Sequence, residues 1–494
     1  MRIPTPAAAT RLGAPRGITL RRAEIAALVV LAVAAFVGFA IYPTYPNYDS
    51  LYSLLWGREI LDGHLPSFDA YRAPTQHPLW VALGVLLAPI GESADRVLLA
   101  ITVASFVALV AALYALGKAT FGVVVGAVAA LLLLSRLDFP FFAARGYIDV
   151  PYLALVIWAG ALEARTPRRG GPVWVLLGLA GLLRPEAWGL AAVYAVWVSW
   201  GRPFGAWVRA GLAAAVAPAI WMASDLVVTG DALYSLHYTT ESAAALGRRQ
   251  ELSELPWITV RFLAELAKWP VFVAGLGGIV LALRLARREM VIPLFLLASG
   301  VGGFLLVSLR GFSVINRYLL VGALMLLLFG AFGLVGFLRL RPGHPARLPW
   351  ALGSLALVLA GGLWTLAHLS PGYVDRELSL RESVRQDFIS VLRDPAVREA
   401  RRCGPVSVPN HKLIADVRWV MDAGPSEVVA RTDPKGAVRA DRGVALFVTG
   451  GWRFLKHPAY GPFDQTEDSA LIQVPRPGFT RAVVGRRFTA YVRC

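Results

Sequence analysis

Long apolar runs separated by short polar loops dominate the first three quarters of the chain. Runs at 97–117, 291–309 and 318–338 approach or reach the roughly 20 apolar residues that cross a bilayer as a helix. Backbone N–H and C=O groups inside lipid must be paired within the spanning structure, which favours helices, and the many short alternating segments of a membrane barrel are absent. The pattern predicts an all-α polytopic membrane bundle.

The arginines indicate the orientation of this bundle. Residues 1–23 carry arginines and no acid, so the positive-inside rule makes them a cytoplasmic tail. We expect about eleven spans, at 24–41, 97–117, 119–135, 150–164, 173–183, 186–200, 210–228, 258–283, 291–309, 318–338 and 350–368. The loops that this topology places in the cytoplasm are arginine-rich, namely 163–171, 201–209, 284–289 and 339–347. We therefore expect a multi-pass plasma-membrane protein whose membrane domain covers 24–368.

The stretch 46–80 is polar and charged although it lies between two apolar segments. The run 78–90 that follows has only about 13 residues, which is short for a span and fits a re-entrant or interfacial helix. If it enters the membrane and returns, residues 43–96 form one long outer loop.

The chain changes composition at residue 369. The region 369–494 has charges of both signs, Pro and Gly punctuation and short apolar runs, and its length of about 120 residues is enough for a core of its own. We predict a small extracytoplasmic soluble α/β domain. Cys403 and Cys494, the two cysteines of the chain, both lie in it and are candidates for a disulfide in an oxidising compartment.

Composition supports the membrane assignment and argues against nucleic-acid binding. Apolar residues make up 56% of the chain and charged residues 16%. The formal net charge is +17, but the arginines cluster at the ends of apolar segments and in the tail. That distribution is typical of membrane topology, and no basic stripe interleaved with aromatics follows a soluble face.

Two carboxylates on the predicted outer side are candidates for chemistry. Asp49 precedes a run compatible with a helix, and Asp149 precedes the helix that Pro151 opens, so each could be only a helix cap. Because both fall on the same side of the membrane, they could instead converge on one cavity and share acid and base work or hold a divalent cation.

Cations on the same side are candidates for binding an anion. Arg184 and Glu186 interrupt a long apolar stretch, where ionisable groups are costly and usually pair or serve a site. A guanidinium fork suits a phosphate, although a simple ion pair at a tight turn is the alternative for Arg184. Further candidates on this side, cationic or supporting, are Arg72, His77, Arg145, Arg317, Tyr48 and Tyr318.

Several of these segments together resemble a known family. The motifs are an acid after the first helix followed by Trp56-Gly-Arg-Glu-Ile and Asp62-Gly63, then Thr75-Gln-His-Pro-Leu-Trp80, Ala144-Arg-Gly-Tyr-Ile-Asp149, Leu183-Arg-Pro-Glu186 and Asn316-Arg-Tyr-Leu-Leu320. In this order, from residue 24 to about 340, they resemble the GT-C glycosyltransferases, and among them the bacterial polyprenyl-phosphate-sugar-dependent enzymes such as actinobacterial arabinofuranosyl- and mannosyltransferases.

The resemblance implies an inverting transfer of a sugar from a polyprenyl-phosphate donor to an envelope glycan, lipid or protein on the outer face of the membrane. It implies that Asp49 is the general base. Asp149, which the topology places on the same side, is our second candidate for a catalytic carboxylate. Cations would hold the phosphate, first Arg184 and Arg317 and then Arg72, His77 and Arg145. No cofactor is specified, and a divalent cation at Asp49 and Asp149 stays open.

Two other functions also stay open. A transporter or flippase for lipid-linked or small polar substrates would need substrate groups near the bilayer midplane, whereas the polar residues here gather at one face. A non-catalytic scaffold would use the soluble tail to bind envelope polymers or proteins.

Overall fold

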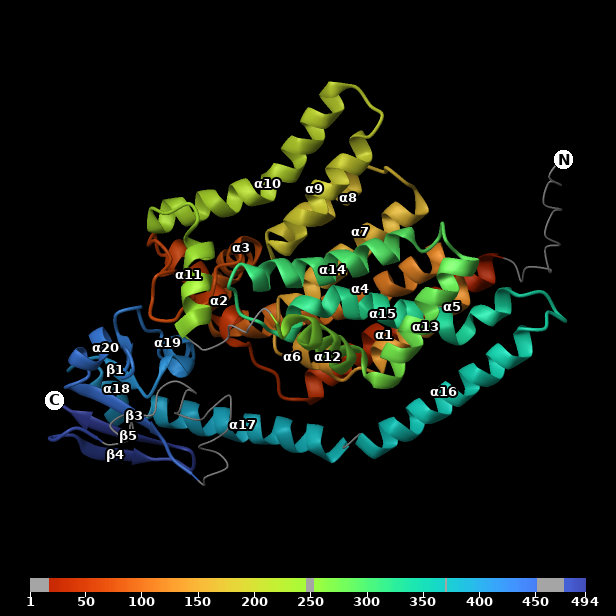
Figure 1. The fold of residues 1–494 in the computed structure, drawn as a ribbon. Helices are drawn as coiled ribbons and strands as arrows, with labels where there is room; N and C mark the ends of the chain where they lie inside the picture. Colours follow the sequence, from red (N-terminus) through yellow and green to blue (C-terminus); the bar gives the residue numbers. More distant parts are fainter. Residues whose placement is uncertain (1–16, 246–252, 369–370, 451–474) are drawn as a thin grey trace.

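The computed structural model describes residues 17–245, 253–368, 371–450 and 475–494. Helices lying alongside one another form a bundle, and a small sheet domain sits at one end of it (Figure 1). The structure therefore has the predicted class, a helical membrane bundle with a small C-terminal α/β domain. Most of the predicted tail 1–23 lies outside the described residues.

The elements of the bundle, in chain order, are α1 (Gly17–Ile41), α2 (Tyr48–Leu61), α3 (Pro78–Leu87), η1 (Ala88–Ser93), α4 (Ala94–Thr120), α5 (Val123–Leu134), α6 (Asp138–Ala144), α7 (Asp149–Arg165), α8 (Gly171–Gly181), α9 (Glu186–Ser199), α10 (Phe204–Thr229), α11 (Tyr234–Ala245), α12 (Leu255–Ala267), α13 (Trp269–Leu285), α14 (Val291–Leu309), η2 (Asn316–Leu319), α15 (Leu320–Val335), η3 (Gly336–Arg339) and α16 (Arg347–His368).

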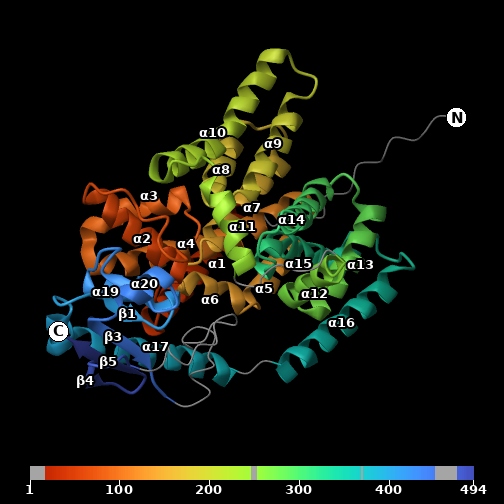
Figure 2. The same cartoon turned by 60° about the vertical axis from the view of Figure 1, so that its left-hand side comes forward.

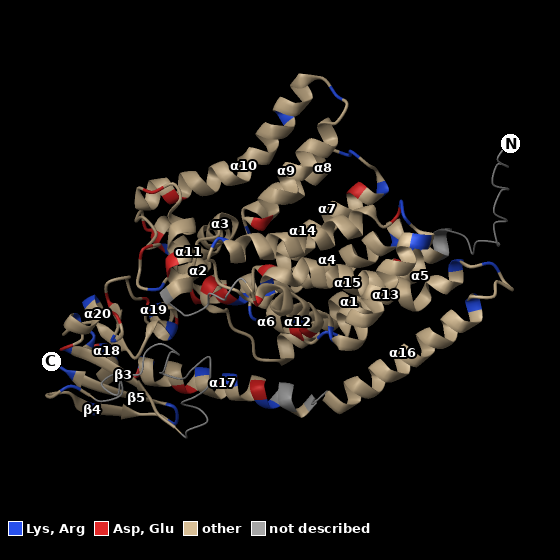
Figure 3. Ribbon diagram, in the orientation of Figure 1, with Lys and Arg blue, Asp and Glu red and all other residues tan. Residues whose placement is uncertain are grey.

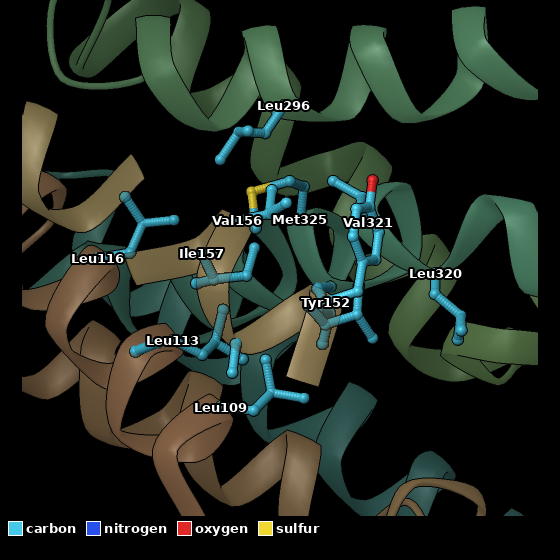
Figure 4. Close-up of a cluster of buried hydrophobic side chains, with 14 of the residues drawn as sticks. Leu109, Leu113, Leu116, Tyr152, Val156, Ile157, Leu296, Leu320, Val321 and Met325 are labelled. Atoms are coloured by element: carbon cyan, nitrogen blue, oxygen red, sulfur yellow. The ribbon is translucent and has the colours of Figure 1, made fainter. Parts of the chain in front are cut away.

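The centre of the bundle is α15, which is apolar on every side and buried from Leu320 to Phe332. A helix without a polar face has to be surrounded by others. It packs against α4, α5, α13 and α14. Figure 4 shows the contact region, where the labelled side chains are Leu109, Leu113 and Leu116 of α4, Tyr152, Val156 and Ile157 of α7, Leu296 of α14, and Leu320, Val321 and Met325 of α15.

The expected count of about eleven spans is not confirmed. Among the described residues, six helices are long and apolar enough to cross a membrane, or up to eight if each of two bent pairs counts as one span. Helices α7, α8 and α9 have 17, 11 and 14 residues, so each falls short of the length that crosses a bilayer without tilt.

The expected span 258–283 is not one straight helix. It divides into α12 and α13, which meet at an angle of 107°. Lys268 at the junction has φ +65°, and Pro270 follows two residues later. A proline disfavours helical geometry in the residue before it and cannot donate the helical N–H bond, so the chain bends although the run remains apolar.

The outer loop contains two short helices in close contact, α2 and α3. A Cβ placed on Gly57 of α2 would lie 2.2 Å from the backbone carbonyl carbon of Gly84 in α3, so only glycine permits this crossing. The predicted helix 78–90 is α3 followed by the 3₁₀ turn η1, which kinks at Gly91 (φ +67°) before α4 begins. Together Pro78–Thr120 spans 43 residues, about twice what a bilayer needs.

The C-terminal domain has a mixed five-stranded sheet in the order β2-β1-β3-β5-β4. Strand β1 pairs in parallel with β2 and β3, and β5 runs antiparallel to β3 and β4. A disulfide joins Cys403 to Cys494. The elements of the domain are α17 (Pro371–Arg393), α18 (Pro395–Ala400), β1 (Val406–Val408), η4 (His411–Leu413), α19 (Ile414–Met421), β2 (Val428–Ala430), α20 (Pro434–Arg439), β3 (Gly443–Val448), β4 (Thr480–Val484) and β5 (Phe488–Arg493).

This domain is docked on the outer loop through α19, which lies against α2 in both views (Figures 1 and 2). Among the residues that the structure describes, four ion pairs cross the contact, namely Glu59–Arg418, Arg58–Asp422, Asp95–Arg385 and Glu92–Arg393. At the opposite end of the bundle the loops carry mainly Lys and Arg (Figure 3). That asymmetry agrees with the charge pattern used to predict the orientation.

Candidate active site

A cavity of about 1260 Å³ lies between the outer loop, the bundle and the sheet domain. Its bundle walls come from the start of α2, the turn before α9, helices α10, α11 and α14, and η2. Its remaining wall comes from α17, η4 and α19 of the C-terminal domain. Nine of the ten predicted site residues line this cavity, and the tenth, Asp149, lies behind two of them.

On the bundle side of the cavity, acidic and basic side chains alternate in a connected series of ion pairs. Asp149, the first residue of α7, is fully buried and pairs with Arg184 through one oxygen and with Arg317 through the other, at 3.1 Å from Arg317 Nη1. Arg184 also pairs with Glu186, whose Oε1 lies 3.4 Å from Arg184 Nε. The interpretation of Arg184 and Glu186 as a mutual ion pair is therefore correct in part, because Asp149 is a further partner.

Burial explains why these charges lie in ion pairs. An isolated charge loses its hydration inside the bundle, and only a close partner with hydrogen bonds compensates for that loss. Both arginines line the cavity, whereas Asp149 is not among the described residues that line it. Asp149 thus orients two guanidinium groups toward the cavity. A guanidinium has five N–H donors, so these pairings leave donors for an anion.

A divalent cation does not fit Asp149. Each of its oxygens already faces a guanidinium, and a hard cation would need those oxygens as ligands. Within the described part of the chain, no group of three or more His, Cys, Asp or Glu side chains is placed to hold a metal ion.

Asp49 lies in the first turn of α2 and lines the cavity. The alternative that it only caps this helix does not apply, since Asn47 is the N-cap and its side chain accepts the Ser50 N–H at 2.9 Å. Ser50 is held in turn by the carbonyl of Gly146 and by Trp80 Nε1. The half-buried Asp49 carboxylate also acts electrostatically on Arg317, so the two side chains belong to the same part of the cavity.

His77, Glu186 and Tyr318 complete this inner part of the cavity. His77 packs edge-on against Trp221, and the Arg184 guanidinium lies 5.1 Å from the centre of the Tyr318 ring. His77 Nδ1 and Glu186 Oε2 are buried and find no hydrogen-bond partner among the described residues. Unpartnered buried polar atoms are costly, which is typical of atoms that meet a ligand.

Arg145 and Arg72 also line the cavity. Arg145 donates to the Tyr45 carbonyl at 3.1 Å and stacks on the Tyr45 ring, instead of pairing with Asp149. Arg72 lies with its guanidinium over Tyr71, and its carbonyl accepts the Tyr48 hydroxyl at 3.1 Å.

The sequence analysis did not identify any residue of the C-terminal domain as part of the site. The structure adds residues that line the same cavity from α17, η4, α19 and β5, namely Arg381, Val384, Arg385, Phe388, His411, Lys412, Leu413, Asp416 and Phe488. Burial raises the pKa of the Asp416 carboxyl to about 6, even though Arg385 and Arg145 act in the opposite direction. No sequence signal marked these residues, because charges are common throughout the tail.

Solved structures share this fold over most of the chain. One is ArnT from Cupriavidus metallidurans bound to undecaprenyl phosphate, with 13% identity, a TM-score of 0.58, and 96% of this chain and 98% of that chain covered. The same protein in the apo state has 14% identity and a TM-score of 0.50, with the same shares covered. The Archaeoglobus fulgidus oligosaccharyltransferase in the apo form has 12% identity and a TM-score of 0.51, and covers 86% of this chain and 69% of that chain.

The sequence comparisons add no closer relationship, since no protein-family model and no curated protein matches the chain. Identities this low carry information about the fold and not about the reaction. The chain therefore has the fold of the GT-C membrane glycosyltransferases, as the resemblance of its loop motifs predicts.

Proposed function

We propose that this chain is a glycosyltransferase that moves a sugar from a polyprenyl-phosphate donor to an acceptor hydroxyl on the outer face of the plasma membrane, with inversion at the sugar carbon. The observation that carries the proposal is the pair of cavity arginines, Arg184 and Arg317, oriented by the buried Asp149 beside the carboxylate of Asp49. The fold of ArnT, whose structure contains undecaprenyl phosphate, supports the class of donor.

The cavity has room for an isoprenoid tail along α9 and α14. Its lining there is apolar, and Val193, Phe295 and Leu306 are at the same time exposed on the outside of the bundle. A Cβ at Gly302 or Gly303 would meet no atom within 4 Å, so the groove stays open at these positions. An apolar chain lying there would exchange membrane lipid for protein contacts while its phosphate reaches the arginines.

In the proposed reaction, Asp49 removes the proton of the acceptor hydroxyl as the oxygen attacks the anomeric carbon of the donor. The bond from that carbon to the phosphate oxygen breaks, and its electron pair stays on the phosphate. Attack from the side opposite the leaving group inverts the configuration. The leaving polyprenyl phosphate gains one negative charge, and Arg184 and Arg317 stabilise that charge because they are held in place before it develops.

The neighbouring groups have supporting roles in this proposal. Asp149 orients the two arginines and does not act as a base, since both of its oxygens are paired. In this proposal, Glu186 Oε2 and His77 Nδ1, which are buried and without partners among the described residues, hydrogen-bond the sugar of the donor. No step requires a metal ion.

The test is to incubate the purified full-length protein with a small panel of polyprenyl-phosphate sugars and to measure released polyprenyl phosphate. We expect Asp49→Asn to lower transfer by roughly 10²–10⁴-fold, the usual contribution of a general base, with donor binding and folding unchanged. Asp69→Asn, at an exposed position of the same outer loop, is the matched control and should behave as wild type. Full activity of Asp49→Asn would show that Asp49 is not the general base. Movement of the lipid-linked sugar across vesicle membranes without sugar transfer would favour a flippase.

A further inference from the structure

We propose that the C-terminal domain forms the acceptor side of the cavity, and that Asp416 binds a hydroxyl group of a carbohydrate acceptor there. This inference rests on the proposed glycosyl transfer. It adds the class of acceptor and a specificity-determining residue that lies more than 350 residues from Asp49 in the sequence.

The domain is fixed to the outer loop and not loosely tethered to it. Arg418 of α19 is 1% exposed at its side chain and pairs with Glu59 of α2, which also accepts from Ser67 N and Oγ. A buried charge pair of this kind is strongly dependent on both partners. Because α19 is held at Arg418, Asp416 two residues earlier has a defined position on the cavity wall.

The Asp416 carboxylate faces this cavity half-buried and without a side-chain partner. It belongs to the lining residues, and within the described residues the only hydrogen bond to it is from its own backbone N–H. A carboxylate accepts up to about four hydrogen bonds, so acceptor capacity remains for a ligand. The position is distinct from the inner site, since Asp416 belongs to α19 of the C-terminal domain, whereas Asp49, Arg184 and Arg317 belong to the bundle.

Three guanidinium groups near Asp416 are engaged with protein groups. Arg385 pairs with Asp95 at 3.1 Å, Arg381 pairs with Glu377, and Arg145 donates to Tyr45 O. None of these contacts uses the Asp416 carboxylate, so its oxygens keep their capacity to accept hydrogen bonds from a ligand.

The cavity wall formed by the start of α2, η4 and α19 also carries an aromatic side chain, Tyr48. Tyr48 is half-buried, and its ring meets His411 edge-on at 6.0 Å between centroids, so α2 and η4 approach each other there. The other aromatic residues at this end are covered, since Arg145 stacks on the Tyr45 ring and Phe388 and Phe488 are buried against each other. Aromatic faces pack against the C–H surface of a sugar while a carboxylate accepts from its hydroxyl groups. This combination of groups favours a neutral, hydroxyl-rich acceptor.

The test uses the full-length protein, a polyprenyl-phosphate sugar, and octyl β-glucopyranoside and octyl α-mannopyranoside as acceptor probes. Transfer to water without probe reports the donor site. We expect Asp416→Asn to raise the KM for the glycoside by roughly 10- to 100-fold, as for loss of a hydrogen bond to a charged group, while release of polyprenyl phosphate to water stays within twofold of wild type. Asp441→Asn, exposed in the same domain, is the matched control and should leave both rates unchanged.

The outcomes separate the two proposals. No release of polyprenyl phosphate from any donor by the wild-type protein would count against glycosyl transfer itself. Release to water with no transfer to either glycoside, or an unchanged glycoside KM in Asp416→Asn, would overturn the acceptor site and leave the transferase proposal in place. A parallel loss of both reactions in Asp416→Asn would show that Asp416 supports the fold or the donor site, and would overturn its assignment to the acceptor.

Discussion

Two sets of ion pairs hold the walls of the cavity, and they differ in their surroundings. The inner set, centred on Asp149, lies wholly within the bundle, where Asp149 is fully buried and Arg184 almost so, while Arg317 is 27% exposed at its side chain. The outer set joins the outer loop to the C-terminal domain and ranges from Arg418, 1% exposed, to Asp422, 82% exposed. Burial makes every member of the inner set necessary to the others, whereas in the outer set only the buried pair is expected to carry much energy.

The two sets of ion pairs support different parts of the proposed function. In the inner set, the pairs hold two cations at the place where the proposed reaction develops negative charge. In the outer set, the pairs hold a separate domain in contact with the cavity. Substitutions in the first set should therefore impair the reaction itself, and substitutions in the second should impair acceptor binding.

The largest effect is expected at Arg184. Arg184→Gln should lower transfer by about 10²–10³-fold, the usual loss when one donor to a developing charge is removed. It should also cost about 3–5 kcal/mol in unfolding free energy, because Asp149 loses a partner inside the bundle. Steady-state kinetics with a polyprenyl-phosphate sugar and thermal unfolding in detergent measure the two effects.

Arg310→Gln is the matched control for this substitution. Arg310 also lines the cavity but is exposed and lies outside the inner set. Its removal should change transfer by less than about threefold, since a solvent-exposed charge contributes little. Equal losses in the two variants would mean that general positive charge, and not the arrangement around Asp149, assists the reaction.

An intermediate effect is expected at Glu59, and its neighbour provides the comparison. Glu59→Gln leaves Arg418 buried without its carboxylate, so the docking of α19 should weaken by about 3–5 kcal/mol. Arg58→Gln removes a pair with the exposed Asp422 and should cost only about 0–1 kcal/mol. Hydrogen exchange of α19 and protease sensitivity of the outer loop report docking directly. Faster exchange in both variants to the same extent would contradict the distinction between buried and exposed pairs.

The same contrast explains what the sequence predicted. Arg184, Asp149 and Arg317 stand out as charges in or beside apolar runs, where lipid and burial make an unneeded charge costly. The structure brings all three together. Asp416 was not identified, because one more charge in a polar tail follows no such rule, and its place in the cavity depends on a domain contact between residues far apart in the chain.

The fold was predictable to a similar degree. The class and the short helix α3 within the outer loop follow from apolar run length, because bilayer thickness sets that length. The division of 258–283 into α12 and α13 did not follow from hydropathy, since the bend leaves the run apolar. Pro270 was the available signal, but its effect depends on whether neighbouring helices accommodate a bend.

The smallest effect expected is a pH dependence of transfer to the glycoside, which arises at the cavity wall formed by α17, η4 and α19. With its pKa raised to about 6 by burial, Asp416 is largely protonated below that pH and then accepts hydrogen bonds poorly. For wild type, kcat/KM for the octyl glycoside should rise as the pH increases through about 6 and level off above it, whereas Asp416→Asn should lack this rise.

The other charged groups at this wall can be tested separately. Arg385 of α17 and Arg145 after α6 act electrostatically on Asp416, while His411 and Lys412 of η4 line the same cavity. His411→Asn should keep the inflection if Asp416 produces it, and transfer to water should show no such inflection because it does not use the acceptor wall. The opposite result would be a pH inflection in kcat/KM that is absent in His411→Asn and present in Asp416→Asn. It would assign the titrating group to His411 of η4, and the acceptor would then be recognised through that histidine.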